Sequence, residues 1–395
     1  MNAATLRAIF VTGSLSHGGA ERHAITLMNR LTERRHECHA VYVKAGAAGL
    51  LDRLRLRGGT VRCLNSTRYF EARAVRDLAA HISLIRPSAI VAANPYALMH
   101  SWLALRLSHL RLPLIVIYHS TRLLGAKEQL QMMLYRPLFW ASACSIFVCE
   151  RQRRHWLRRG AFSRRNEVIY NGVDTDEFRD DWNAEQRRAL RRRLGFRDAD
   201  YVIGISALLR PEKNHLQLVD AVARLRASGI PAKALMIGDG EMRGAIEARA
   251  GELKVGGDIV ITGLQQDVRP CIAACDATVL CSVTEAFSLA AIEAMALSRP
   301  VVHSDVGGAA EMILPGRNGF LFPVGDTAAL VSRLAILADG AVARRMGHSA
   351  REMVEARFSE KTMVDRYERL LLELCGQGSP AGVHPDHGGF ESSTH

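Results

Sequence analysis

The chain has 395 residues, of which 48% are hydrophobic and 23% are charged, a composition that excludes an intrinsically disordered protein. The length exceeds what one ordinary hydrophobic core supports, so we expect a soluble globular protein of two domains. The net charge of +12 is uneven, because residues 1–200 hold 33 Lys and Arg against 17 Asp and Glu, whereas residues 201–395 hold 19 against 23. The basic half indicates either an anionic partner or a well-solvated arginine-rich surface, and both readings stay open.

Short apolar runs alternate with helical patterns along the chain, which is typical of parallel sheets covered by helices on both faces. In the first half we expect strands at Arg7–Val11, Cys38–Val43, Val61–Leu64, Ala89–Ala93, Leu112–Tyr118, Ser145–Cys149 and Val168–Tyr170. In the second half we expect them at Tyr201–Ser206, Ala232–Ile237, Asp258–Thr262, Ala277–Leu280, Pro300–Ser304 and Gly319–Phe322. The predicted fold class is α/β, with two doubly wound Rossmann-like domains that face a central cleft.

The polar stretch from Asn171 to Asp200 is rich in Arg and Asp, which predicts a linker with a short helix. Helical patterns close the fold at Asp326–Ala338, Ala341–Arg357 and Thr362–Leu374. We expect an N-terminal domain over 1–175, a linker over 176–200, a C-terminal domain over 201–358, a helix over 359–375 that packs back toward the N-terminal domain, and a disordered tail over 376–395.

The eight cysteines form no quartet at zinc-ligand spacing, since Cys271 and Cys275 have no second pair. Ordinary strand and loop residues explain the group His36, Cys38 and His39 better than a metal site does. Free thiols without a disulfide framework fit a reducing cytoplasm. We expect no N-terminal signal, and no apolar run approaches the roughly 20 residues that span a bilayer. The sequence therefore predicts a cytoplasmic protein that can lie on a membrane without crossing it.

The loop after the predicted strand Ala277–Leu280 carries two carboxylates and a helix start. Ser288 is placed to cap the following helix, whose free N–H groups are suited to bind a pyrophosphate. An anion there gains roughly 0.3–1 kcal/mol from the helix dipole, and about 2 kcal/mol when partly buried. Glu285 precedes the helix and Glu293 lies two turns in, so they can reach different parts of one ligand. Taken alone, such a pair is more often simply solvated.

Other loops at the expected carboxyl ends of strands carry weaker signals, and these are the ends at which open α/β sheets bind ligands. The loop after the first strand of the second half carries Arg210 and Lys213, which can neutralise phosphates. Gly18 and Gly19 lie in the first loop of the chain and permit close backbone approach. His119 ends the fifth predicted strand. Exposed charges, tight turns and structural histidines are the common alternatives for each.

Taken together, these residues resemble glycosyltransferase family 4, a retaining family of the GT-B fold, up to about Leu374. Any one motif is weak, whereas their full order is specific. The resemblance rests on Gly18-Gly19-Ala20-Glu21, Asn171-Gly172-Val173-Asp174 with Phe178, Arg210-Pro211-Glu212-Lys213-Asn214-His215, Gly238-Asp239-Gly240, Glu285 with Glu293 at the E-x7-E spacing, Asp305-Val306-Gly307-Gly308 with Glu311, and Gly316-Arg317-Asn318-Gly319-Phe320.

The resemblance implies a retaining sugar transfer from a nucleotide diphosphate-sugar, with UDP as the expected nucleotide and no metal or other cofactor. Glu285 is expected to contact the donor sugar and Glu293 the ribose hydroxyls. His119 is expected near the reacting carbon. The departing diphosphate helps to deprotonate the acceptor hydroxyl, while the protein supplies positioning and electrostatic stabilisation. The donor phosphates are expected at the backbone amides of Phe287, Ser288 and Leu289 and at Arg210 and Lys213, with Gly18 and Gly19 bordering the phosphates and the acceptor.

Three positions depart from the family pattern. Leu208 replaces an arginine that many members carry, so Arg210 is expected to take over its phosphate contact. Ala286 replaces a glycine in the E-x7-E segment, which is a mild change. Ala92-Ala93-Asn94-Pro95 lies where many members have a histidine, so the sequence gives little guidance on the acceptor side.

Two other patterns suggest chemistry that we do not expect here. Asp174-Thr175-Asp176 fits a D-x-D metal motif but follows Asn171-Gly172, where a turn role is better supported. Gly238-Asp239-Gly240 with Gly244 has the wrong spacing for a dinucleotide fingerprint, which speaks against a dehydrogenase.

The acceptor and the location follow from the resemblance and the charge. We expect a lipid-linked or cell-surface glycan as acceptor and no nucleic acid partner, since no aromatic array accompanies the charge. The basic stretch from Arg151 to Arg165 predicts contact with an anionic membrane surface, although the arginines do not share one helix face. Two other functions remain open: a nucleotide-sugar epimerase, and a non-catalytic protein that binds nucleotide or glycan.

Overall fold

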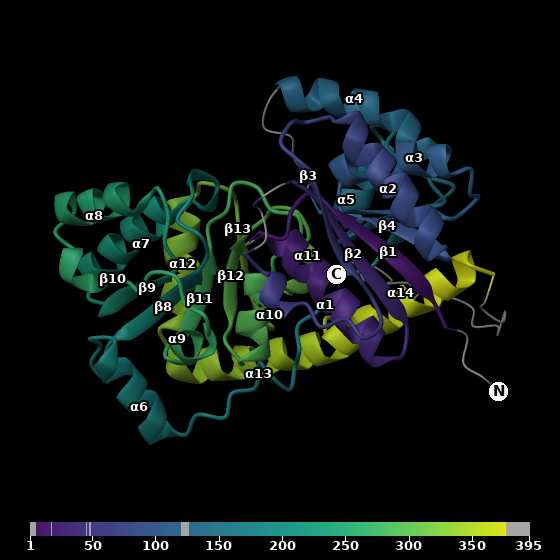
Figure 1. Cartoon of the computed structure of the whole chain (residues 1–395). Helices are drawn as coiled ribbons and strands as arrows, with labels where there is room; N and C mark the ends of the chain where they lie inside the picture. The colour runs from purple at the N-terminus through teal and green to yellow at the C-terminus, as the bar shows by residue number, and fades with distance from the viewer. Residues whose placement is uncertain (1–4, 17, 45, 47–48, 120–125, 377–395) are drawn as a thin grey trace, which may run out of the picture.

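The computed structural model describes residues 5–16, 18–44, 46, 49–119 and 126–376. They form two α/β domains that lie side by side (Figure 1). The tail predicted to be disordered lies outside the described residues, apart from Gly376.

The N-terminal domain is built on a parallel seven-stranded sheet in the order β3-β2-β1-β4-β5-β6-β7. Because β1 lies between β2 and β4, the strand order reverses at its carboxyl end, where doubly wound sheets bind ligands. The strands are β1 Arg7–Thr12, β2 Glu37–Lys44, β3 Val61–Ser66, β4 Ala89–Ala92, β5 Leu114–Tyr118, β6 Cys144–Phe147 and β7 Arg165–Val168. The helices are α1 Gly19–Glu33, η1 Leu51–Arg53, α2 Ala72–Ile85, α3 Pro95–Ser108, α4 Ala126–Trp140 and α5 Glu150–Leu157.

The C-terminal domain repeats this arrangement in a parallel six-stranded sheet in the order β10-β9-β8-β11-β12-β13. The order reverses at β8, so the loop after β8 corresponds to the loop after β1. The strands are β8 Tyr201–Ser206, β9 Ala232–Ile237, β10 Ile259–Ile261, β11 Ala277–Leu280, β12 Val301–Ser304 and β13 Gly319–Phe322. The helices that follow β7 along the chain are α6 Ala184–Arg193, η2 Pro211–Lys213, α7 His215–Ala227, α8 Arg243–Glu252, η3 Gly256–Asp258, α9 Arg269–Ala273, α10 Leu289–Ala296, α11 Ala309–Met312, α12 Thr327–Leu337, α13 Gly340–Arg357 and α14 Glu360–Leu374.

The predicted fold class, two doubly wound domains, is confirmed, and most central strands lie where the apolar runs placed them. The predicted strand Val168–Tyr170 is wrong, because β7 runs over Arg165–Val168. This edge strand pairs with β6 on one side only, and its half-buried polar residues give no apolar run to detect. The predicted end of the sixth strand at Cys149 is also wrong, since Cys149 lies at the N-cap of α5.

The chain crosses between the domains twice, and the two crossings are bonded to each other. Val173 donates its N–H to the carbonyl of Phe358 at 3.0 Å, and the N–H of Glu360 donates to the carbonyl of Val173 at 2.8 Å. Helix α14 then returns along the N-terminal domain and adds Met363, Val364, Tyr367, Leu370 and Leu371 to its core beside α1. Figure 1 shows this return as the yellow helix that runs below α1. The two crossings together form the hinge at the base of the cleft.

Candidate functional site

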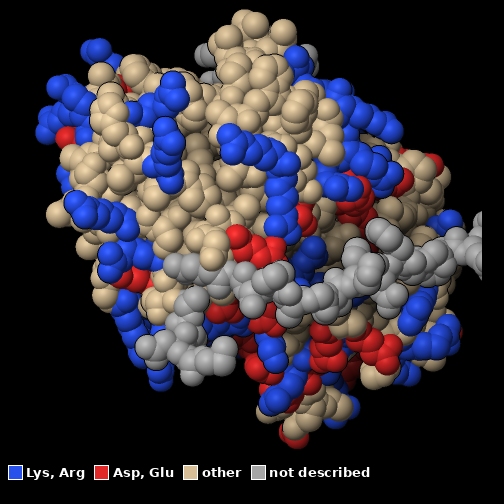
Figure 2. Space-filling model, turned by 90° about the vertical axis from the view of Figure 1, so that its right-hand side faces the viewer, with Lys and Arg blue, Asp and Glu red and all other residues tan. Residues whose placement is uncertain are grey.

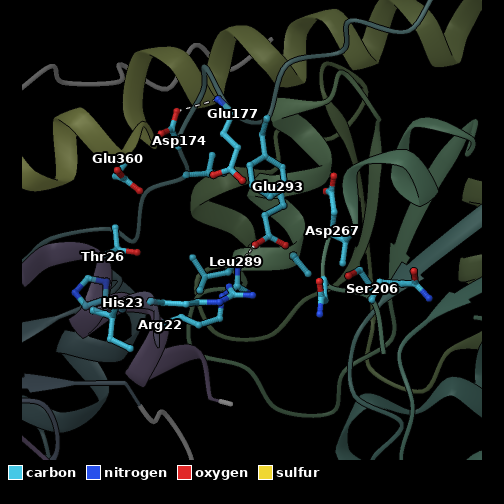
Figure 3. A pocket seen from close by; sticks show the side chains of 18 of the residues that line it. Arg22, His23, Thr26, Asp174, Glu177, Ser206, Asp267, Leu289, Glu293 and Glu360 are labelled. Atoms are coloured by element: carbon cyan, nitrogen blue, oxygen red, sulfur yellow. Dashed lines mark hydrogen bonds and ion pairs between the residues drawn. The ribbon is translucent and has the colours of Figure 1, made fainter. Parts of the chain in front are cut away.

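A cavity of about 490 Å³ lies between the two domains. Its walls come from α1, the hinge residues 172–178, the segments that follow β8, β9 and β10, and the start of α10. Figure 3 shows side chains from both domains pointing into this space. Its size is that of an ordinary small-molecule site. The lining residues that matter most below are Arg22, His23, Leu208, Leu289 and Glu293.

The predicted cap of α10 is confirmed, because the N–H of Ala291 donates to Oγ of Ser288 at 3.3 Å. Leu289 begins the helix and lines the cavity. Glu293 lies one turn further, with 4% of its surface exposed. Its Oε1 accepts a hydrogen bond from Nη2 of Arg22 at 2.7 Å. The carboxylate expected to bind ribose is therefore buried at the domain boundary, where a cation of the other domain holds it.

The start of α1 faces the start of α10 across the cleft. Gly19 begins α1, and a Cβ built on it would lie 3.9 Å from Cδ1 of Leu289. At the N-cap position, a Cβ on Gly18 would overlap the carboxylate of Glu21, which also accepts from Oγ of Ser14 at 3.0 Å. Helix starts carry unpaired N–H groups and a positive partial charge. Two such ends therefore converge on one place, where an anion is favoured.

Lys213 and Glu285 form an ion pair, with Nζ 2.5 Å from Oε2. The loop that carries Lys213 is held against the strand end after β11, because the N–H of Val283 donates to the carbonyl of Glu212 at 2.9 Å. His303 on β12 is buried nearby, and burial lowers its pKa while Glu285 partly opposes that effect. Neither Lys213 nor Glu285 lines the cavity itself. The structure thus brings these two predicted residues together, and of the three only Glu293 lines the cavity.

His119 lies next to His23, with ring centroids 4.9 Å apart, and His23 lines the cavity. Burial lowers the pKa of His119 to about 4 and lowers the pKa of His23 well below its usual value. Nε2 of His23 lies 3.1 Å from the hydroxyl of Tyr367, whereas Nε2 of His119 has no hydrogen-bond partner among the described residues. His119 is therefore neutral near pH 7 and offers a hydrogen-bonding nitrogen close to the cleft wall.

Leu208 occupies the position at which many family members carry an arginine, and Arg210 lies two residues further along the chain. The side chain of Leu208 lines the cavity, so this part of the wall is apolar. Arg210 is exposed at the N-cap of η2 and does not line the cavity. The predicted phosphate contact of Arg210 stays a prediction.

Phe287 offers a ligand its main chain only, because its ring is buried in the hinge. The ring lies 5.3 Å from the rings of Tyr170 and Phe358. A Cβ on Gly308 would lie 2.7 Å from Cδ2 of Phe287 and 2.8 Å from Cβ of Cys149. Gly308 is thus explained by the close approach of the two domains at this point, whereas Gly307 has a φ of +53° and a Cβ there would lie 2.2 Å from the carbonyl oxygen of Glu285.

Asp174 has the turn role that was predicted for the D-x-D pattern. Its Oδ1 accepts hydrogen bonds from the N–H of Asp176 at 2.9 Å and of Glu177 at 3.0 Å. Its Oδ2 lies 2.6 Å from Nη2 of Arg30 on α1. Within the described parts of the chain, no group of three or more His, Cys, Asp or Glu is arranged to hold a metal ion.

Sequence reasoning missed Arg22 and His23, which lie directly after the Gly18–Glu21 motif. A signal was present, because Gly19, Arg22, Thr26 and Asn29 recur at helical spacing and place a polar face on the first helix. Arg22, Thr26 and Asn29 all line the cavity. His303 was also missed, and nothing in its apolar strand marks it.

Two family models match the chain, Glycosyltransferase Family 4 over residues 17–177 and Glycosyl transferases group 1 over residues 186–353. The chain belongs to glycosyltransferase family 4. The two matched ranges follow the two sheets of the structure, one on each side of the hinge. This family 4 chain therefore has the two-domain GT-B fold.

Two relatives of this family 4 chain align over about half of their own length. N-acetyl-alpha-D-glucosaminyl L-malate synthase of Bacillus anthracis is 29% identical over 209 residues, which is 53% of this chain and 54% of the relative. The lipopolysaccharide core biosynthesis glycosyltransferase LpsE of Rhizobium meliloti is 31% identical over 175 residues, which is 44% of this chain and 50% of the relative.

The fold is shared over the whole length of a solved structure. The crystal structure of Anabaena HepE in complex with UDP-glucose has a TM-score of 0.81 at 22% identity, and the match covers 93% of this family 4 chain and 100% of that chain. No helix in the described part of this chain combines the length and the apolar character that crossing a membrane requires.

Proposed function

We propose that this family 4 chain is a retaining, metal-independent glycosyltransferase that moves a hexosyl or N-acetylhexosaminyl group from a UDP-sugar to a hydroxyl of a lipid-linked or cell-surface glycan. The observation that carries the proposal is the convergence of two helix starts, those of α1 and α10, beside the buried carboxylate of Glu293. This arrangement offers positive partial charge for a diphosphate and an acceptor for ribose hydroxyls in one cavity.

The donor would span the C-terminal half of the cleft. Glu293 would accept hydrogen bonds from the ribose hydroxyls, and the main chain at Phe287, Ser288 and Leu289 would hold the diphosphate. Lys213 would neutralise part of its charge, aided by Arg210 when the loop after β8 closes on the donor. Glu285, already fixed by Lys213, would then face the hydroxyls of the donor sugar. HepE, which shares the fold, binds UDP-glucose, and this supports a UDP-sugar as the donor.

The reaction itself needs few protein groups. The bond between the anomeric carbon and the diphosphate oxygen breaks, and the acceptor oxygen bonds to the same face of the sugar. The acceptor proton passes to an oxygen of the departing diphosphate, so the anomeric configuration is kept. Neutral His119 would hydrogen-bond the sugar near the reacting carbon, and the helix starts would stabilise the charge that develops on the leaving group.

The proposed acceptor and location rest on a relative and on where such acceptors are made. LpsE acts in lipopolysaccharide core biosynthesis, which supports a surface glycan borne by a lipid. Such acceptors are made at membranes, so we place the protein in the cytoplasm at the inner face of the cytoplasmic membrane.

A thermal-shift screen against UDP, GDP, ADP and their sugar conjugates, with and without EDTA, tests the donor assignment. A nucleotide at 100 times its dissociation constant stabilises the fold by about 2.7 kcal/mol, and this shift should appear for UDP in EDTA. Glu293→Ala should abolish the shift. Glu185→Ala, which removes an exposed carboxylate on α6 away from the cavity, is the control and should leave it unchanged.

The product distinguishes the proposal from its alternatives. A transferase releases UDP only when an acceptor is present, and the sugar ends on the acceptor with its anomeric configuration retained. An epimerised sugar nucleotide without transfer would establish the epimerase instead. UDP binding without turnover on any lipid-linked glycan would establish a non-catalytic binding protein.

A further inference from the structure

Helix α4 is apolar on its outer face as well as on its inner face. Its inner residues Met132, Tyr135 and Phe139 belong to the core of the N-terminal domain. A helix that only covers a sheet normally turns a polar face to water. On the outer face, one stripe at helical spacing is exposed instead, with Leu130 62% exposed, Met133 54%, Leu134 72% and Trp140 50%, together with Pro137. We name these five residues the α4 ridge.

The ridge lies in a strongly basic part of the chain. From Leu78 to Asn166 the sequence holds 13 Lys and Arg and only 2 Asp and Glu, so this segment carries +11 of the net charge of +12. In space, Figure 2 shows the corresponding side of the molecule as mostly tan and blue over its upper part, where the N-terminal domain lies, with most of the red in the lower half. Uncharged and cationic side chains therefore share the upper part of this surface, where few carboxylates lie.

Unpaired arginines lie at the C-terminal end of the ridge. Nε1 of Trp140 donates to the carbonyl of Gly160 at 2.9 Å, and the rings of Trp140 and Phe162 lie 6.0 Å apart. The turn around Gly160 is therefore fixed against α4. Its arginines are exposed, and among the described residues none of them forms an ion pair with a carboxylate: Arg158, Arg159 and Arg164.

The basic stretch expected to meet a membrane divides into two parts in the structure. Arg151 pairs with Asp305 of the C-terminal domain at 2.7 Å, and Arg153 and Arg154 pair with Glu150. These arginines thus have carboxylate partners within the protein, although Arg153 and Arg154 share one. Among the described arginines of this stretch, those of the following turn, next to Trp140, have no carboxylate partner.

We propose that the α4 ridge and the arginine turn at residues 158–164 bind this protein to the surface of an anionic lipid bilayer. Leucine, methionine and tryptophan side chains would enter the boundary between headgroups and acyl chains, and the arginines would contact anionic headgroups. A second copy of the chain fits less well, because two segments of +11 would oppose each other. An acidic partner protein would match the arginines but would leave the apolar stripe without a counterpart.

A line of aromatic rings leads from α4 to the residue that follows β1. The hydroxyl of Tyr69 contacts the hydroxyl of Tyr135 on α4, and Tyr69 and Phe70 are both about half exposed. The ring of Tyr69 lies 5.0 Å from that of Tyr96, and a Cβ on Gly13 at the end of β1 would lie 3.4 Å from Tyr96. A lipid-linked acceptor held in the bilayer would thus reach the loop that leads into α1. This last step rests on the proposed function, whereas the proposed bilayer binding does not.

Co-sedimentation of the full chain with lipid vesicles tests the proposed bilayer binding. The wild type should bind vesicles of phosphatidylcholine and phosphatidylglycerol and should bind pure phosphatidylcholine at least about tenfold more weakly. Replacing two ridge residues in the variant Leu130→Ser with Leu134→Ser should weaken binding to the anionic vesicles by about tenfold or more. The matched control, Val324→Ser with Ile336→Ser, removes exposed apolar side chains of the C-terminal domain and should bind like the wild type.

A charge-reversal pair tests the arginine turn. The double variant Arg158→Glu with Arg159→Glu should lose binding to anionic vesicles at low salt. The control variant Arg344→Glu with Arg345→Glu, on α13 of the other domain, should bind these vesicles at least about tenfold more tightly than the first variant does. UDP should still raise the melting temperature of all four variants. Loss of vesicle binding can therefore be distinguished from failure of the donor site.

Three results would overturn the proposed bilayer binding. The first is a wild type that ignores anionic vesicles. The second is equal loss in the ridge and control variants. The third is a wild-type dimer, detected by sedimentation velocity, that the ridge variant converts to a monomer, because this would assign the ridge to a second copy.

Discussion

At the scale of single residues, the ion pair of Arg22 and Glu293 is the feature with the clearest consequence. The two side chains come from different domains, and the carboxylate is 5% exposed whereas the arginine is 47% exposed. A ribose that bonds to Glu293 must share or displace this arginine. The pair therefore holds the cleft surfaces together at the cost of competing with the proposed donor.

Removing the competing cation should strengthen nucleotide binding. We expect Arg22→Ala to bind UDP about two- to fivefold more tightly, because an ion pair with a half-exposed arginine is worth about 0.5–1 kcal/mol. Isothermal titration calorimetry measures the change. Arg53→Ala is the matched control, because Arg53 lines the same cavity but forms no ion pair with a described carboxylate. Weaker UDP binding by Arg22→Ala would show that the arginine contacts the donor instead.

At the scale of elements, the start of α10 has two roles in the proposal. Ser288 stabilises the helix by accepting the N–H of Ala291, and the same helix start offers N–H groups to the diphosphate. A structural cap and a ligand site therefore coincide. Helix α12 has a cap of the same geometry, in which Asp326 accepts the N–H of Ala329 at 2.9 Å, but it does not line the cavity.

The two caps separate stability from binding. Ser288→Ala and Asp326→Ala should each lower the free energy of unfolding by about 1 kcal/mol, because each removes one N-cap hydrogen bond. Only Ser288→Ala should also weaken UDP binding, by about two- to tenfold, since the helix start loses its order at the phosphate site. Denaturant unfolding and calorimetry give the two quantities. Equal UDP affinity in both variants would remove α10 from the donor site.

At the scale of the whole molecule, buried histidines lie in both domains. Burial lowers the pKa of His119 and of His215 to about 4 and lowers the pKa of His23 and His303 as well. Both ring nitrogens of His215 lack a hydrogen-bond partner within the described chain. The fold therefore favours neutral rings in both domains at once, which makes the whole molecule sensitive to acid.

Acid should destabilise the protein before most carboxylates titrate. The unfolded chain binds protons at His119 and His215 below about pH 6.5, whereas the folded chain does not bind them until about pH 4, so the free energy of unfolding falls as the pH is lowered across that window. His119 and His215 would each account for at most about 3 kcal/mol. Urea unfolding at pH 7.5 and pH 5 should show a large loss for the wild type and a smaller one for His215→Gln. Equal stability of the wild type at both values would contradict the assignment.

The sequence determined the features that depend on short stretches of chain. Apolar runs fixed central strands such as β8, β9 and β11, because a buried parallel strand shows its burial residue by residue. The turn at Asp174 and the cap at Ser288 were equally predictable, since each satisfies backbone groups only two or three residues away. The motif loops follow strand ends, so their common edge could also be inferred before any contact was known.

Only the tertiary structure decided the features that join distant segments. Arg22 and Glu293, which are 271 residues apart in the sequence, form a hydrogen bond. His119 lies beside His23 because the end of β5 and the first turns of α1 lie at the same edge of the sheet. The edge strand β7 escaped detection because a strand paired on one side needs no apolar run. In the second half of α4, the apolar residues Met132 to Leu134 and Pro137 to Trp140 would indicate burial, yet one stripe of them is exposed. A pattern along the chain reports what a residue prefers, whereas the packing of the two domains decides which of those preferences is met.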